Sequence, residues 1–128
     1  MEVKINSIGI DNSCISELEF NKTIYNQNKC NTYHISLYDD YDKRIGFGFF
    51  TIIPCSIAKI NNIHILRKKD RRKGYATILY NKMEQIINQN CIYWIIGDAF
   101  EDSLKFWFAK GFRIGKFESN LVPIEKIL

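Results

Sequence analysis

The chain has 128 residues, of which 46% are apolar and 25% are charged. A chain of this length and composition fits one domain that buries well over half of its surface, so its core needs neither disulfides nor a structural metal. The formal charge of +4, from 18 Lys and Arg against 14 Asp and Glu, mildly favours polyanionic ligands and does not by itself indicate nucleic acid.

Nothing in the sequence indicates a membrane protein or an exported one. The longest uncharged apolar-rich run, 45–58, is too short to cross a bilayer as a helix and contains two glycines and a proline. The N-terminus has no basic start followed by a long apolar stretch. The four cysteines lie far apart, without a CxxC pair or a His spacing that suits zinc. We therefore expect a cytoplasmic protein with reduced thiols and no metal site.

The first half of the chain has the pattern of strands. A turn cluster of Asp, Tyr and Lys separates two segments rich in β-branched and aromatic residues, which predicts a β-hairpin that ends at Pro54. Segment 13–29 has no clear pattern, although its apolar residues could form the face of a short helix. The strands predicted in this half cover 2–10, 32–38 and 44–53.

The second half alternates strands with helices. Apolar residues recur at helical spacing over 74–90, and a second helix is predicted over 103–110 with Gly111 as its C-cap. The continuous apolar run 91–96 predicts a strand that is buried on both faces in the middle of a sheet. The remaining segments are a strand over 58–66, a basic loop over 67–73 and a last strand over 112–117. This order predicts an α/β unit.

The basic loop precedes the most regular helix, and this position predicts an anion site. The first amides of a helix lack intrahelical acceptors, and the helix dipole adds positive charge there. Gly74 has no Cβ and Ala76 has only a methyl group, so a diphosphate could approach the backbone closely. Neither a Walker loop nor a GxGxxG loop is present, and a solvated surface loop or nucleic-acid patch is the alternative interpretation of the charges. Six cations stand in the loop against Asp70 alone: Arg67, Lys68, Lys69, Arg71, Arg72 and Lys73.

Two segments resemble motifs of one family. The sequence Arg-Arg-Lys-Gly-Tyr-Ala at 71–76 resembles the [RQ]xxGx[GA] loop of the GNAT superfamily of N-acetyltransferases. The segment 103–112 is similar to a later segment of that family, in which an aromatic pair precedes Gly-Phe. The resemblance spans about residues 58–117 and implies a single α/β domain with a mixed, mostly antiparallel sheet flanked by helices.

The resemblance also implies an acetyl-CoA-dependent N-acetyltransferase. Strands 58–66 and 91–96 would splay apart to admit the pantetheine arm, and a primary amine of a small molecule or a protein would attack the thioester directly in a ternary complex. No membrane or nucleic-acid partner is implied, and the chain could be a monomer or a homodimer. The cofactor-binding residues implied are Ile63, Ile65, Leu66, Arg71, Arg72, Lys73, Gly74, Tyr75, Ala76, Thr77 and Trp107.

Trp107 stands where many members of the family carry a Tyr that protonates the leaving thiolate, and an indole N–H cannot act as a general acid near neutral pH. Expelling a thiolate of pKa ~8.5 at pH 7 costs about 2 kcal/mol, whereas deprotonating an amine of pKa ~10.4 costs about 4.6 kcal/mol. A base therefore matters more than an acid. Our first choice is His64, which would share a strand face with Asn62 and Leu66. The other candidates for proton transfer are Asp98, Glu101 and Asp102 as bases, Tyr93 and Tyr75 as donors, and His34 on an earlier strand.

Each of these residues also has a structural interpretation. A lone strand histidine is often a hydrogen-bonded packing residue, acidic residues at a helix start often cap it, and aromatic residues fill cores. Two other functions stay open at this point. One is an acyl-CoA-binding module without turnover, and the other is a nucleic-acid-binding protein that uses 67–73.

Overall fold

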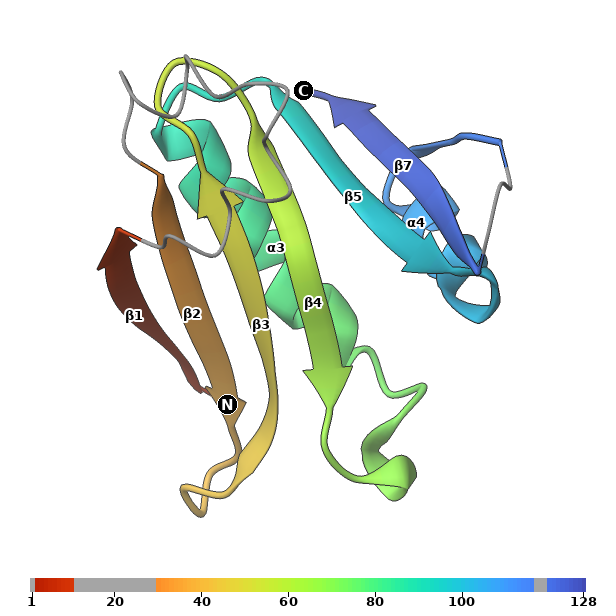
Figure 1. The fold of residues 1–128 in the computed structure, drawn as a ribbon. Coiled ribbons are helices and arrows are strands. Elements are labelled where there is room, and N and C mark those ends of the chain that lie inside the picture. Colours follow the sequence, from red (N-terminus) through yellow and green to blue (C-terminus); the bar gives the residue numbers. More distant parts are fainter. Residues whose placement is uncertain (1, 11–29, 117–119) are drawn as a thin grey trace.

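The computed structural model describes residues 2–10, 30–116 and 120–128, and in this part of the chain seven strands form one sheet in the order β1-β2-β3-β4-β5-β7-β6. Two α-helices lie behind the sheet in the view of Figure 1. All neighbouring strands are antiparallel except β4 and β5, which are parallel. The expected mixed, mostly antiparallel sheet flanked by helices is confirmed.

The first four strands form an antiparallel meander. The strands predicted over 2–10, 32–38, 44–53 and 58–66 are confirmed to within a residue or two. Segment 13–29, whose pattern was left open, lies outside the described residues. The bounds are β1 Glu2–Ile10, β2 Asn31–Tyr38, β3 Arg44–Ile52 and β4 Ala58–Ile65.

The last three strands differ from the prediction. β5 (Trp94–Phe100) begins three residues later than expected, because Cys91 has a positive φ and the amide of Ile92 donates back to Ile87 O in the turn that ends the preceding helix. Its side chains alternate between buried and exposed, so the expectation of burial on both faces is wrong.

Of the strand expected over 112–117, the described residues 112–116 contain only β6 (Arg113–Ile114), and residue 117 lies outside them. β7 (Leu121–Ile127) was not predicted at all. It contains a proline and two charged residues, which obscured the alternation of its buried Val122 and Ile124.

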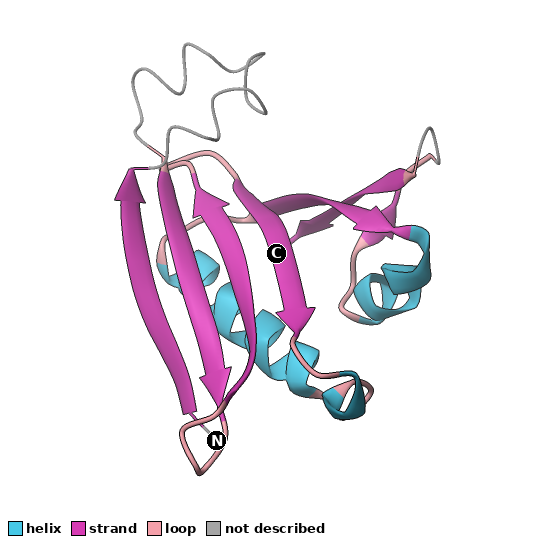
Figure 2. Cartoon of the chain, turned by 60° about the horizontal axis from the view of Figure 1, so that its bottom comes forward, coloured by secondary structure: helices cyan, strands magenta, loops and turns pink. Residues whose placement is uncertain are grey.

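The two helices confirm their predictions. α3 (Tyr75–Gln89) buries Leu79, Met83 and Ile87 against the sheet, and Figure 2 shows it lying across β2, β3 and β4. α4 (Leu104–Ala109) has Lys110 as its C-cap, and Gly111 follows in the left-handed conformation that commonly terminates a helix, as predicted. Among the described residues, no helix is long and apolar enough to cross a bilayer. Two short 3-10 turns, η2 (Lys68–Asp70) and η3 (Glu101–Ser103), precede α3 and α4.

Candidate functional site

The candidate site lies where β4 and β5 separate. The two strands pair over three residues, from Ala58 opposite Ile95 to Ile60 opposite Gly97, and then diverge toward their C-terminal ends (Figure 1). Beyond these pairs, no described strand covers the edges of β4 and β5 that face each other, so their backbone groups are available to a ligand.

A β-bulge in β4 coincides with the point of separation. Ile60 is opposite Phe50 and Asn62 is opposite Phe49, so Asn61 is an extra residue in β4. Its side-chain amide donates a hydrogen bond of 2.9 Å to Thr51 Oγ1 on β3. The bulge therefore keeps β4 attached to β3 while pairing with β5 stops.

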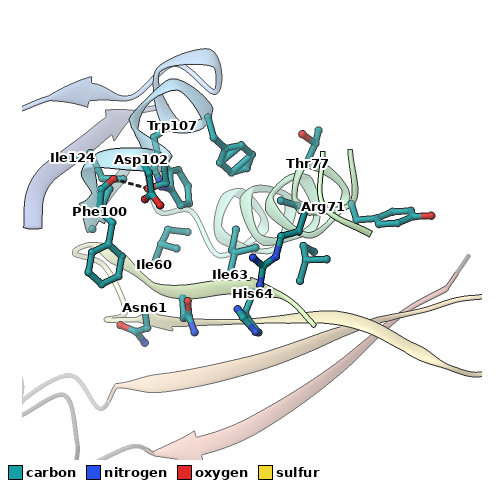
Figure 3. A pocket seen from close by; sticks show the side chains of 18 of the residues that line it. Ile60, Asn61, Ile63, His64, Arg71, Thr77, Phe100, Asp102, Trp107 and Ile124 are labelled. Atoms are coloured by element: carbon teal, nitrogen blue, oxygen red, sulfur yellow. Dashed lines mark hydrogen bonds between the residues drawn. The ribbon is translucent and has the colours of Figure 1, made fainter. Parts of the chain in front are cut away.

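The resulting cleft has a volume of about 660 Å³. Figure 3 shows its side chains, with those of β4 on one side and those of α4 and the start of α3 on the other. Its lining residues are Ile60–Ile65, Asp70–Arg72, Gly74–Thr77, Gly97–Phe100, Asp102, Ser103, Phe106, Trp107 and Ile124.

The N-terminus of α3 opens into this cleft. Gly74, the N-cap residue, has a φ of +82°, a conformation that side chains other than glycine adopt only with strain. The first helical hydrogen bond at this end runs from the amide of Ile78 to Gly74 O at 3.2 Å. The amides of residues 75–77 precede that bond and have no acceptor within the helix. A Cβ built on Gly74 would meet no atom within 4 Å, so there is open space beside these donors.

The loop before α3 is held in place by one buried carboxylate. Asp70 is only 7% exposed and accepts a hydrogen bond of 2.8 Å from Arg67 Nε. The amides of Asp70 and Arg71 donate to the carbonyls of Arg67 and Lys68, at 3.0 and 3.2 Å. Asp70 therefore anchors the loop through Arg67, and Arg71 and Arg72 line the cleft.

Two ionisable side chains from facing strands line the cleft below the helices. His64 is exposed on the face of β4 that points away from α3, with its ring centroid 5.6 Å from that of Phe47. Asp98 lies on β5, and its Oδ2 is 3.9 Å from Lys59 Nζ. Both side chains are candidates to accept a proton from an amine in the cleft.

Solved structures resemble this architecture over almost the whole chain. A proposed acyl-CoA N-acyltransferase from Klebsiella pneumoniae has a TM-score of 0.70 at 12% identity, covering 98% of this chain and 97% of that one. Tetrahymena GCN5 has a TM-score of 0.69 at 13% identity, with 99% and 96% covered. The PaiA N-acetyltransferase of Thermoplasma acidophilum, solved in complex with coenzyme A, has a TM-score of 0.66 at 14% identity, with both chains fully covered. The chain has the fold of the GNAT acetyltransferases. No family model and no curated protein matches its sequence.

The GNAT fold brings most of the predicted cofactor-binding residues to the cleft, but not Leu66 or Lys73. Leu66 lies past the end of β4, and its amide donates to Ile45 O on β3 at 2.9 Å. Lys73 is exposed and outside the lining. The nine predicted residues that do line the cleft are Ile63, Ile65, Arg71, Arg72, Gly74, Tyr75, Ala76, Thr77 and Trp107.

The fold brings only some of the predicted proton-transfer residues to the cleft. His64 and Asp98 line the cleft, as do Asp102 and Tyr75. Tyr93 does not, because it precedes β5 at the end of that strand opposite to the cleft, where its carbonyl accepts from the amide of Leu128. Glu101 does not either, since η3 turns it toward a separate shallow recess beside Phe100 and Asn120.

Trp107 is both a wall of the cleft and a packing residue. Its side chain is 8% exposed and packs edge-on against Tyr80 and Phe112, at centroid distances of 5.7 and 5.1 Å. Burial, with the nearby Glu84 carboxylate, raises the pKa of Tyr80 far above its usual range. Tyr80 therefore stays protonated beside Trp107 and is not a base.

Several lining residues were missed by the sequence analysis. Asn61 is at the bulge, Phe100 ends β5, and Ser103 donates to Phe100 O at 2.9 Å at the start of α4. Ser103 and Phe100 carried no signal of their own. Asn61 did, because the pair Asn61-Asn62 interrupts the alternation of apolar residues between Ile60 and Ile63.

Proposed function

We propose that this protein is an acetyl-CoA-dependent N-acetyltransferase that transfers an acetyl group to a primary amine by direct attack in a ternary complex. The observation that carries the proposal is the left-handed Gly74, which opens the bare N-terminus of α3 into the cleft between the diverging strands. The likeness to solved acetyltransferases supports it.

The cleft offers partners to two parts of acetyl-CoA, the pyrophosphate and the pantetheine arm. The free amides of 75–77 and the guanidinium groups of Arg71 and Arg72 would bind the pyrophosphate, and the open space at Gly74 leaves room for it. The unpaired edge of β4 beyond Ile60 offers backbone groups to the amides of the pantetheine arm. Phe106 and Trp107 supply an apolar wall. When bound, acetyl-CoA supplies an activated acyl group on a thioester.

The reaction requires the chain to place an amine beside that thioester and to accept one proton. An ammonium ion first loses a proton, the neutral amine attacks the carbonyl carbon, and the C–S bond breaks as the C–N bond forms. The second proton lost from nitrogen balances the charge of the departing thiolate. Holding both reactants in one cleft supplies much of the acceleration, and backbone donors would polarise the carbonyl.

His64 is the residue we assign as base. Its ring lines the cleft from β4, and it is exposed enough to exchange protons with solvent. Asp98, on the facing strand, is the alternative. A His64→Gln variant should bind acetyl-CoA normally but lose about 10²-fold or more in kcat, the range typical of a general base. An unchanged kcat and pH profile would exclude His64.

The decisive experiment is a calorimetric titration with acetyl-CoA, with CoA and ATP as controls, followed by release of thiol in the presence of an amine panel. Acetyl-CoA and CoA should both bind, and ATP should bind more weakly because it lacks the pantetheine arm. No binding of acetyl-CoA would overturn the proposal.

A catalytically inactive acyl-CoA-binding module is the second candidate, and Trp107 at the position of the usual proton donor favours it. Binding without thiol release above background for any amine, peptide or RNA would select this candidate. A nucleic-acid-binding role would instead show affinity for RNA or DNA that falls steeply with salt and depends on several cations of 67–73 at once.

A further inference from the structure

A second cavity adjoins the cleft at Asp98. Its volume is about 460 Å³, within the range of small-molecule sites. It shares Gly97, Asp98 and Ile124 with the cleft and extends from there over β7 and β6. Its lining residues are Lys59, Ile96, Gly97, Asp98, Arg113, Ile114, Gly115, Pro123, Ile124 and Glu125.

The cavity lies on the face of the sheet opposite to the core. Ile95 and Ala99 of β5 are buried in the core, so Ile96 and Asp98, which alternate with them, point to the other face. A ligand in the second cavity would therefore approach the gap between β4 and β5 from the side away from α3.

Four charged residues from four neighbouring strands lie on this face of the sheet. Strand register places Lys59, Glu125 and Arg113 in one row through Ile96, because Lys59 is opposite Ile96, Ile96 is opposite Glu125, and Glu125 is opposite Arg113. Asp98 stands two residues further along β5, toward the cleft. Asp98 is thus the carboxylate nearest to the cleft, Lys59 faces it with Nζ 3.9 Å from Asp98 Oδ2, and Arg113 lies at the far end of the row.

The four charges are not equally available to a ligand. Glu125 uses both oxygens, one to accept from Trp94 Nε1 at 3.1 Å and the other facing Arg113 Nη1 at 3.7 Å. The Arg113 side chain is 78% exposed, and this ion pair is longer than a hydrogen bond. Its guanidinium carries five N–H donors in a planar fork, which is the geometry that binds a carboxylate through two hydrogen bonds.

We propose that the second cavity binds the carboxylate of the acceptor, with Arg113 as its main partner, and that the acceptor is a small amine of the amino-acid type. The inference rests on the proposed function. The ammonium group lies toward Asp98 and the cleft, and the carboxylate lies toward Arg113. A polyamine would place its second ammonium group against the same guanidinium.

The test compares acceptors that differ only in the carboxylate. The twenty amino acids, their carboxyl amides, the matching decarboxylated amines and spermidine are each assayed for thiol release at saturating acetyl-CoA. We expect the best acceptor to be a free amino acid. Arg113→Gln should lower its kcat/KM roughly tenfold to a hundredfold, mainly through KM, the range expected for hydrogen bonds to a charged group. The matching amide should be unaffected, and Arg113→Lys should fall between.

Lys116→Gln is the matched control, since it removes one positive charge from an exposed position two residues beyond β6 and outside both cavities. Its acceptor kinetics should equal those of the wild type. The inference is overturned if amides or spermidine are acetylated as well as amino acids, if Arg113→Gln affects acid and amide equally, or if no amino acid is acetylated. A titration with acetyl-CoA separates the two proposals: a wild-type protein that binds no acetyl-CoA overturns both, whereas binding without these acceptor effects overturns this inference alone.

Discussion

Replacing Gly74 by Glu tests the phosphate site most directly. The new Cβ would meet no protein atom within 4 Å, so the cost to folding comes from backbone strain at φ +82°. An L-residue in the left-handed conformation costs about 1–2 kcal/mol. The carboxylate would occupy the space beside the free amides of α3. Two unit charges 4 Å apart at an effective dielectric constant of 20 repel by about 4 kcal/mol, which corresponds to roughly a thousandfold weaker binding of acetyl-CoA.

Gly111→Ala is the matched control for strain. Gly111 has a φ of +91°, close to that of Gly74, but lies just after α4, where a new Cβ would come 3.3 Å from Cε of Lys126. The ammonium group of Lys126 is held by Lys110 O at 2.7 Å and by Glu84 at 3.0 Å, so Gly111→Ala should lose at least as much unfolding free energy in urea as Gly74→Glu. Only Gly74→Glu should lose affinity for acetyl-CoA in calorimetry. A folded Gly74→Glu protein that binds acetyl-CoA as tightly as the wild type would refute the assignment of the phosphate site.

Three further predictions concern the stability of the domain, each measured as the free energy of unfolding in urea. Tyr80→Phe should change the stability by less than about 1 kcal/mol, because the buried hydroxyl makes no hydrogen bond of good geometry among the described residues and has only the Glu84 carboxylate near it; a loss above 1 kcal/mol would show that the contact with Glu84 stabilises the fold. Gly48→Ala should cost about 1–3 kcal/mol, because its Cβ would lie 2.2 Å from Met83 Cε in the core and 3.1 Å from the backbone oxygen of Asn62, and no loss would show that the Met83 side chain can repack. Burial, and then the Arg44 guanidinium, lowers the pKa of His34 from 6.5. The unfolded chain therefore binds more protons below pH 6.5, so the wild type should lose stability as the pH falls from 7 to 5, and His34→Gln should lose less; equal losses would contradict the assignment.

The sequence predicted those parts of the fold in which a local pattern and its surroundings agree. The helical stripe of α3 is one example, because one face of this helix is buried and the other is not. The hairpin of β2 and β3 is another, because two segments rich in β-branched and aromatic residues flank a cluster of turn residues. β7 was missed because its place in the sheet depends on β5 and β6, which are distant in sequence. β5 was placed too early because the apolar run that precedes it fills the turn after α3 instead of extending the strand.

Parts of the candidate site were likewise predictable from local sequence, and other parts were not. The left-handed glycine at the start of α3 was predictable in its position, because a glycine at a helix start after a basic run has local geometric consequences. Which proton-transfer candidates line the cleft was predictable only in part, because their positions depend on which end of a strand meets the cleft. Tyr93 and Asp98 are five residues apart on one segment, yet only Asp98 reaches the cleft. The second cavity could not be predicted from the sequence, because it depends on the strand register. The register brings Lys59 and Arg113 into one row although 54 positions separate them in the sequence.

The bulge in β4 did leave a mark in the sequence, and it explains why the cleft exists. Core residues of the strand occupy even positions up to Ile60 and odd positions from Ile63 onward, so the alternation shifts by one residue at Asn61. Such a shift is incompatible with a regular strand that keeps one face in the core, and one extra residue resolves it. The extra residue falls directly after the last pair with β5. Deleting Asn61 would therefore leave Ile60 and Ile63 two positions apart, on one face of a regular strand without a bulge. With Asn61 present, the chain can keep both residues in the core only by means of the bulge, and the bulge marks the point at which β4 leaves β5 and the cleft begins.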